Sequence, residues 1–192
     1  MTRPIALEVA LNGPWGPRQP RAPLAPAAIV EEALACAAEG AAILHVHGWD
    51  ADAPRQTDAW ETYARIIEAV RSRSDAVIYP TIPLAGADPA APPLPPAKRF
   101  AHVEALAARG LIEWTVVDPG TVNFVAPGET GFVYRNAPEE IRHGLALCAR
   151  TGLRPSYALY EPGFARAGAL LAEEAGPDLA TPVYRAMFSE GF

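Results

Sequence analysis

The feature that most constrains this chain is a regular alternation of short apolar runs with longer amphipathic ones. Strand-like runs cover residues 5–11, 42–47, 76–79, 114–117, 156–160 and 182–188, with a further short extended piece at 132–134. Helical patterns lie between them, at residues 27–39, 57–73 (with Thr57 as N-cap), 97–109, 138–151 and 164–174. Such alternation predicts parallel strands joined by right-handed helical crossovers. We therefore expect six strands in one parallel, curved sheet.

Two common nucleotide-binding folds lack their signatures. No G-x-G-x-x-G follows the first strand, and the chain contains no G-x-x-x-x-G-K-[ST]. A (β/α)8 barrel suits the alternation, but such a barrel takes about 250 residues, and this chain has 192. The sequence thus predicts an α/β fold, a TIM-type barrel truncated to about six β-α units, as a single partial domain over residues 1–192. Its open strand edges predict self-association or marginal stability.

Composition excludes several classes of protein. Half of the chain is hydrophobic and 20% is charged, so it can bury a core and is not disordered. The net charge is −6 without any basic run, which excludes nucleic acid and anionic membranes as partners. No apolar stretch approaches the roughly 18 residues of a membrane span, and no secretory signal opens the chain. Cys36 and Cys148 lie far apart in helical patterns, which indicates reduced thiols and a cytoplasmic location.

His45 and His47 stand two residues apart at the carboxyl end of the second predicted strand. This spacing puts both side chains on the same face, at the end of a barrel strand where active sites lie. Two adjacent imidazoles suit a divalent metal, Zn²⁺ first. The alternative is a buried, hydrogen-bonded histidine with a chance neighbour. His102 and His143 fall within helical patterns and are expected to be exposed or packed on the outer ring.

Polar residues also follow the other predicted strands, and their convergence on one rim predicts a substrate site formed by Asn12, Thr81, Asp118, Thr121, Asn123 and Glu161. Each of them alone is also compatible with ordinary turn chemistry. Glu161 is the candidate catalytic carboxylate, because it precedes Pro162 and Gly163 without an obvious capping duty; an exposed loop acid is the alternative. Trp15 and Trp49 follow the first two strands, where they could form a pocket wall.

Five segments, in chain order, resemble the β-keto acid cleavage enzyme family: Asn12-Gly13, EEALACAAEGAAILHVH, YPT, VVDPGTVNF and RPSYALYEPG. The resemblance covers the whole chain. It implies a (β/α)8 barrel that binds Zn²⁺ and reacts a β-keto acid with acetyl-CoA to give acetoacetate and a new acyl-CoA. On the same analogy, His45 and His47 are zinc ligands and Thr81 helps to bind the keto acid. We expect a homo-oligomer whose partners are these small molecules.

The chain departs from the family pattern in three places. Family members complete the zinc site with a Glu beyond the sixth unit, preceded by a catalytic Arg and followed by an Asp, and this region is absent here. The family's acidic residue after the first strand is replaced by Trp15, and acidic positions of the fifth strand are Ser156 and Ala158, which leaves Glu161. We therefore expect no detectable acyl exchange from these 192 residues.

Two other functions fit part of the pattern. A metal-dependent hydrolase of the amidohydrolase type also carries H-x-H on a barrel strand. In that type the pair belongs to the first strand and further histidines follow, whereas the predicted strands four to six contain none. The second alternative is a non-catalytic, shortened relative that keeps the fold without the site.

Overall fold

The computed structural model describes residues 5–14, 19–50, 52, 55–82, 92–125, 128 and 131–188. Trp15, expected to wall a pocket, lies outside the described residues, as does most of the Pro/Ala-rich loop before residue 97. Within the described ranges, no helix is both long enough and apolar enough to cross a membrane.

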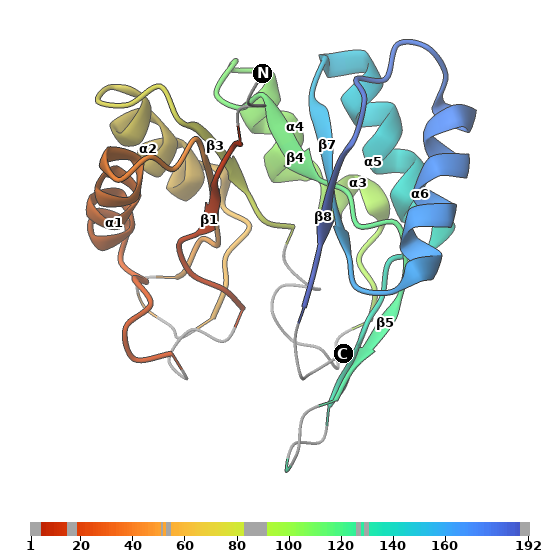
Figure 1. Ribbon diagram of the computed structural model, residues 1–192, viewed down its shortest axis with the longest axis horizontal. Coiled ribbons are helices and arrows are strands. Elements are labelled where there is room, and N and C mark those ends of the chain that lie inside the picture. Colours follow the sequence, from red (N-terminus) through yellow and green to blue (C-terminus); the bar gives the residue numbers. More distant parts are fainter. Residues whose placement is uncertain are drawn as a thin grey trace.

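The strands form two parallel sheets, which confirms the predicted α/β class (Figure 1). The first sheet has the order β1 (Glu8–Ala10), β2 (Ile43–Val46) and β3 (Val77–Pro80). The second has the order β4 (Trp114–Val116), β7 (Arg154–Leu159) and β8 (Val183–Ala186). In both, the middle strand pairs in parallel with each neighbour, as right-handed crossovers require.

The prediction of one continuous sheet is wrong at the junction of β3 and β4. These strands lie side by side, but no ladder joins them in the described part of the chain. Pro80 ends β3 and has no N–H to donate, and the bulky rings of Tyr79 and Trp114 meet at this junction with centroids 6.1 Å apart. No closed barrel is formed by the described residues, because β1 and β8 share no ladder either.

The helices cover the outer side of each sheet (Figure 1). They are α1 (Pro26–Ala38), α2 (Trp60–Arg71), α3 (Pro96–Arg99), α4 (Ala101–Ala107), α5 (Pro138–Thr151) and α6 (Pro162–Ala175). Two helix predictions need correction. The helix expected over 97–109 is divided at Phe100. Thr57 is not the N-cap of α2, which is Ala59; instead the Thr57 hydroxyl accepts the Ala59 N–H at 3.1 Å.

One continuous apolar core joins the two halves. It contains fully buried side chains from the first sheet, such as Leu44 and Ile78, and from the second half, such as Leu145 and Tyr157. Gly144 allows α5 to approach closely, because a Cβ there would lie 2.8 Å from the Phe100 ring. Burial of this apolar surface is the main stabilising term.

A β-hairpin interrupts the β-α order after β4. Its strands β5 (Val122–Phe124) and β6 (Phe132–Tyr134) pair antiparallel. The sequence predicted only the second as extended. Val122 and Tyr134 pack against Phe164 in a small separate cluster, which fixes the hairpin against α6.

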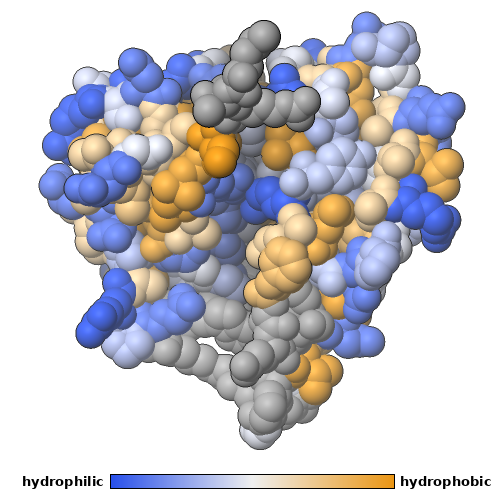
Figure 2. Space-filling view, viewed as in Figure 1, coloured by the Kyte–Doolittle hydropathy of each residue, from blue (hydrophilic) through white to orange (hydrophobic). Residues whose placement is uncertain are grey.

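The space-filling view shows a hollow on the face that carries β1 and β8 (Figure 2). Hydrophilic atoms form its floor and apolar residues gather along its margins. The exposed apolar side chains of β1 and β8 and their flanks are Ile5, Leu7, Tyr184 and Phe188.

Candidate metal and substrate site

The two histidines of the H-x-H motif lie side by side. His45 is in β2 and His47 follows directly after it, and their ring centroids are 5.1 Å apart at 82°. The His45 ring also contacts Tyr79 of β3, at 5.0 Å between centroids. Both imidazoles therefore project from the same face of the first sheet, as the two-residue spacing predicts.

Neighbouring amide groups hold His47. Its Nδ1 lies 2.6 Å from Gln56 Oε1, which can only accept, so Nδ1 carries the proton and Nε2 keeps its lone pair. Asn12 holds the backbone: its Oδ1 accepts the His47 N–H at 2.8 Å, and its Nδ2 donates to the carbonyls of His47 at 3.0 Å and Pro23 at 2.8 Å. The Asn12 amide thus ties the end of β1 to the metal-ligand candidate.

His45 has an unused polar atom. Its Nδ1 is buried and has no hydrogen-bond partner among the described residues. Burial lowers the pKa of His45 well below its usual value, helped by His47 and Arg185. Burial also lowers the pKa of His47, to about 4, although its bond to Gln56 opposes this. Both rings are therefore neutral at pH 7, the form that binds metals.

Asp118 occupies the second sheet's side of the molecule. Its Oδ1 accepts the Ala158 N–H at 2.8 Å and its Oδ2 accepts the Tyr134 hydroxyl at 2.7 Å. Burial raises the pKa of this carboxyl, and the nearby Arg185 opposes the rise. The hairpin thus helps to hold Asp118 by supplying Tyr134.

Sequence reasoning missed Arg185, a partly buried cation of β8. It is in register with Ala158 of β7, and its Nη1 lies 3.4 Å from Glu8 Oε1 of β1. Burial opposes the charged form, but the neighbouring Tyr79, Asp118 and Glu8 outweigh it and raise the pKa of Arg185. The sequence contained a signal for Arg185 and Glu8, because each is a charged residue inside an apolar strand.

The remaining predicted site residues divide into buried and exposed ones. Thr81 is buried; its N–H donates to the Val46 carbonyl at 2.8 Å, and its own carbonyl lies 2.9 Å from His102 Nε2. Thr121, Asn123 and Glu161 are exposed. Their substrate or catalytic roles stay predictions, as do those of Asn12, Thr81 and Asp118.

Thr121 and Glu161 differ in their local hydrogen bonding. The Thr121 hydroxyl donates to the Asn136 carbonyl at 3.2 Å and accepts the Asn136 N–H at 3.0 Å, which closes the base of the hairpin. Glu161 is the N-cap residue of α6, but its side chain makes no capping hydrogen bond. Its carboxylate is thus not committed to the helix end.

The other sequence candidates have packing roles. His102 is buried and stacks on Tyr63 with centroids 5.5 Å apart, and His143 lies against Phe100, so both belong to the outer ring. Trp49 is buried and forms an isolated bridge with Gln56. The bridge brings the Gln56 side chain within hydrogen-bonding distance of His47. No local pattern in the sequence indicates this bridge.

Comparison with protein families gives one match over nearly the whole chain. The family described as beta-keto acid cleavage enzyme matches residues 4–189. This chain belongs to that family. The resemblance drawn from the sequence motifs is thereby confirmed. A search of curated proteins found no match.

Solved structures of ObcA share the fold of this beta-keto acid cleavage family member. The apo structure of ObcA matches with a TM-score of 0.66 and 20% identity over 86% of this chain. The binary complex of ObcA with oxaloacetate gives 0.63 and 21% over 83%, and the ternary complex with a C4-CoA adduct and oxalate gives 0.65 and 20% over 86%. The matches cover 36–37% of the ObcA chains, so this chain spans little more than a third of their length.

The donor set of this family member fits a zinc ion in part. Two histidine ligands of one metal ion each need a free ring nitrogen and a fixed orientation. His45 has a buried nitrogen without a partner among the described residues, and the His47 ring is neutral and oriented by Gln56. No group of three or more His, Cys, Asp or Glu side chains that could hold a metal occurs among the described residues. Two histidines leave further coordination positions for other oxygen ligands.

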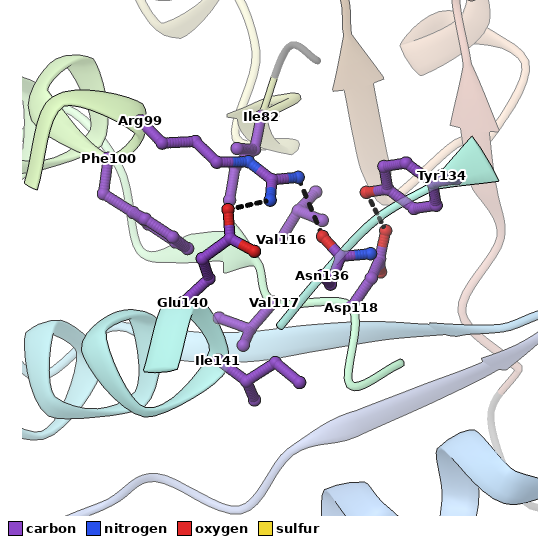
Figure 3. Close-up of a pocket in the computed structure, with 10 residues that line it drawn as sticks. All are labelled: Ile82, Arg99, Phe100, Val116, Val117, Asp118, Tyr134, Asn136, Glu140 and Ile141. Carbon is purple, nitrogen blue, oxygen red and sulfur yellow. Dashed lines mark hydrogen bonds and ion pairs between the residues drawn. The ribbon is translucent and has the colours of Figure 1, made fainter. Parts of the chain in front are cut away.

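A small cavity lies apart from the histidine pair in this family member, beside Asp118 (Figure 3). In its wall, Arg99 donates to Glu140 at 3.0 Å and to Asn136 at 2.7 Å. Arg99 pairs with Glu140, and Asp118 accepts the Tyr134 hydroxyl. The apolar part of the wall consists of Ile82, Phe100, Val116, Val117 and Ile141. We therefore regard it as a packing feature that joins α3 to α5.

Proposed function

We propose that this chain carries the metal- and keto acid-binding part of a zinc-dependent β-keto acid cleavage site, a type of site that exchanges acyl groups between a β-keto acid and acetyl-CoA. The observation that carries the proposal is the buried His45 Nδ1 without a partner, directly beside a His47 ring oriented by Gln56. A buried polar atom without a partner costs about 1–3 kcal/mol, so a ligand from outside the chain would relieve it. Membership of the family supports the same chemistry.

His45 and His47 would hold the metal, with at least two further positions open to substrate, water or another carboxylate. A zinc ion bound there would supply positive charge that stabilises negative charge developing on the keto oxygen. The protein's own contribution is orientation: Gln56 fixes the His47 tautomer, and Asn12 fixes its backbone. Because the two imidazoles are neutral, a zinc site built on them would carry a net positive charge, which favours an anionic substrate.

The reaction conserves all atoms without an added oxidant or reductant. A β-keto acid R–CO–CH₂–COO⁻ and acetyl-CoA (CH₃–CO–SCoA) would give acetoacetate and R–CO–SCoA, with one C–C bond and one C–S bond broken and one of each formed. The titles of the ObcA complexes, with oxaloacetate and with a C4-CoA adduct, support a small keto acid and a CoA thioester as the ligand classes.

We further propose Glu161 as the base that takes the proton from C2 of the keto acid. Its carboxylate is exposed and makes no capping bond. Asp118 is less suited, because both of its oxygens already accept hydrogen bonds. The proposed substrate-binding residues are Asn12, Thr81, Asp118, Thr121 and Asn123.

The barrel type, the domain bounds and the cellular location are part of the same proposal. We infer that the two sheets are six units of a (β/α)8-type barrel and that residues 1–192 form one domain, which the continuous core supports. The free thiols of Cys36 and Cys148 support a reducing, cytoplasmic setting. The amidohydrolase alternative is disfavoured because the histidine pair is on β2, between β1 and β3.

The proposal is tested by two assays on zinc-loaded protein, with the double variant His45→Ala/His47→Ala as control. The first follows deuterium exchange at C2 of acetoacetate by NMR, and the second follows transfer of label from ¹³C-acetyl-CoA into acetoacetate. We expect C2 exchange above the control without acyl transfer. Absence of both reactions would favour a non-catalytic relative, and acyl transfer by these 192 residues would show that they complete the site.

A further inference from the structure

Arg185 places a cation between the two sheets, and the proposed reaction does not yet give it a role. It lies on β8, and only about a fifth of its side chain is exposed (19%). Its Cζ is 6.0 Å from the centre of the Tyr79 ring. The Tyr79 ring also contacts His45, with centroids 5.0 Å apart, so Arg185 and His45 share a neighbour.

Within the described part of the chain, this guanidinium uses little of its hydrogen-bonding capacity. Arginine has five N–H donors, and the acceptor that Arg185 reaches among the described residues is Glu8 Oε1 at 3.4 Å, near the limit of a hydrogen bond. That oxygen already accepts a bond of 2.5 Å from the Tyr79 hydroxyl. Arg185 Nε is buried and has no partner among the described residues.

Arg99 provides a comparison within the same molecule. Its two terminal nitrogens donate to three oxygens, those of Asn136 at 2.7 Å, Glu140 at 3.0 Å and the Arg135 carbonyl at 3.1 Å. Arg99 Nε is buried without a partner among the described residues, as Arg185 Nε is. The difference lies in the terminal nitrogens, because within the described part of the chain those of Arg185 make one long contact, to the Glu8 carboxylate.

The contacts of Arg185 place it beside both halves of the proposed site. Arg185 is in register with Ala158, whose N–H donates to Asp118 at 2.8 Å, and its guanidinium faces the Tyr79 ring that contacts His45. A planar fork of N–H donors in a partly buried setting matches the two oxygens of a carboxylate.

We infer that Arg185 is the carboxylate anchor of this site, binding the carboxylate group of a small anionic keto acid whose keto group faces His45 and His47. The inference rests on the proposed function and adds a substrate-binding residue to it. Because arginine stays protonated, Arg185 would position and select the substrate and would not move a proton.

The test measures binding of two probes by calorimetry: acetoacetate and its neutral methyl ester. The variants are Arg185→Gln, Arg185→Lys and Glu8→Gln, with Arg154→Gln on β7 as the matched control, since Arg154 is a strand arginine that donates to an exposed backbone carbonyl. We expect Arg185→Gln to weaken acetoacetate binding about 10-fold or more and to leave ester binding unchanged. Arg185→Lys should be intermediate, because a point charge replaces the fork.

Glu8→Gln should bind acetoacetate more tightly than the parent, because Glu8 competes for the guanidinium, and Arg154→Gln should match the parent. Equal acetoacetate affinity of the parent and Arg185→Gln would overturn the inference and leave the proposed function standing. Failure of the parent to bind acetoacetate would overturn both. If circular dichroism shows Arg185→Gln to be unfolded, parent-like binding by both Arg185→Lys and Glu8→Gln would overturn the inference.

Discussion

At the scale of single residues, the side chains around His47 explain how an H-x-H motif acquires a fixed orientation. Gln56 fixes the protonated nitrogen and Asn12 fixes the backbone on both sides of the peptide. Partners of this kind keep a metal-binding imidazole in one tautomer and one orientation.

Gln56→Ala should weaken zinc binding by about 10- to 100-fold, because His47 then loses the acceptor that holds its Nδ1 proton. The fold should persist, since a single hydrogen bond contributes only about 1 kcal/mol. A competition titration with a zinc-sensitive dye measures the affinity, and Gln19→Ala, at an exposed position, is the control. Equal zinc affinity of Gln56→Ala and the parent would exclude this role for Gln56.

Asn12→Ala should destabilise the protein by about 2–3 kcal/mol, because three hydrogen bonds between the β1 end, His47 and Pro23 are lost. The effect is measured by urea unfolding, where the midpoint should fall without a change in slope. An unchanged midpoint would mean that the loop after β1 does not depend on this amide.

The sequence predicted the histidine pair but not the residues around it, Gln56, Glu8 and Arg185, for a physical reason. A spacing of two within a strand fixes which face both rings occupy. Gln56 reaches His47 only through the backbone bridge between Trp49 and Gln56, a loop conformation with no periodic signature. Glu8 and Arg185 meet across 177 positions of the chain, which spacing cannot reveal.

At the scale of helices and strands, the interruption of the predicted 97–109 helix places an arginine at the end of α3, where it contacts α5. The break at Phe100 separates α3 from α4, and Arg99 at the end of α3 reaches Glu140 in α5. The two side chains are each only 5% exposed. The apolar pattern predicted the existence of the helix, but the break depends on contacts more than 30 residues away.

Arg99→Met should destabilise the protein by about 3–5 kcal/mol, because it leaves the buried Glu140 carboxylate without its main partner. The matched control is Arg142→Met, which removes an ion pair to Glu174 in which both side chains are about half exposed. Such pairs contribute little to stability. Thermal unfolding of both variants provides the measurement, and equal melting temperatures for the two would contradict this assignment.

At the scale of the whole molecule, the parallel order of the strands followed from the β-α rhythm, but the division into two sheets did not. The division depends on Pro80 and on the rings of Tyr79 and Trp114, whose meeting is a tertiary contact. Among the described residues, β1 and β8 each have one edge without a ladder partner, and Ile5 (94% exposed) and Phe188 (92% exposed) flank these strands. Unpaired edges with apolar flanks favour association.

The 192-residue chain should therefore self-associate, with a sedimentation coefficient that rises with protein concentration. Ile5→Lys combined with Phe188→Lys should reduce the association by adding charge next to both edges. Leu170→Lys, at an exposed position of α6, is the control and should not change it. A concentration-independent monomer would show that neither edge is an interface.

The central claim is that His45 and His47 form the metal-binding edge of a keto acid site. Zinc titration of the parent protein and of His45→Ala/His47→Ala, with the bound metal quantified after removal of free zinc, tests it most directly. The parent should retain one zinc ion per chain and the double variant none. Equal zinc retention by the two proteins would contradict the claim.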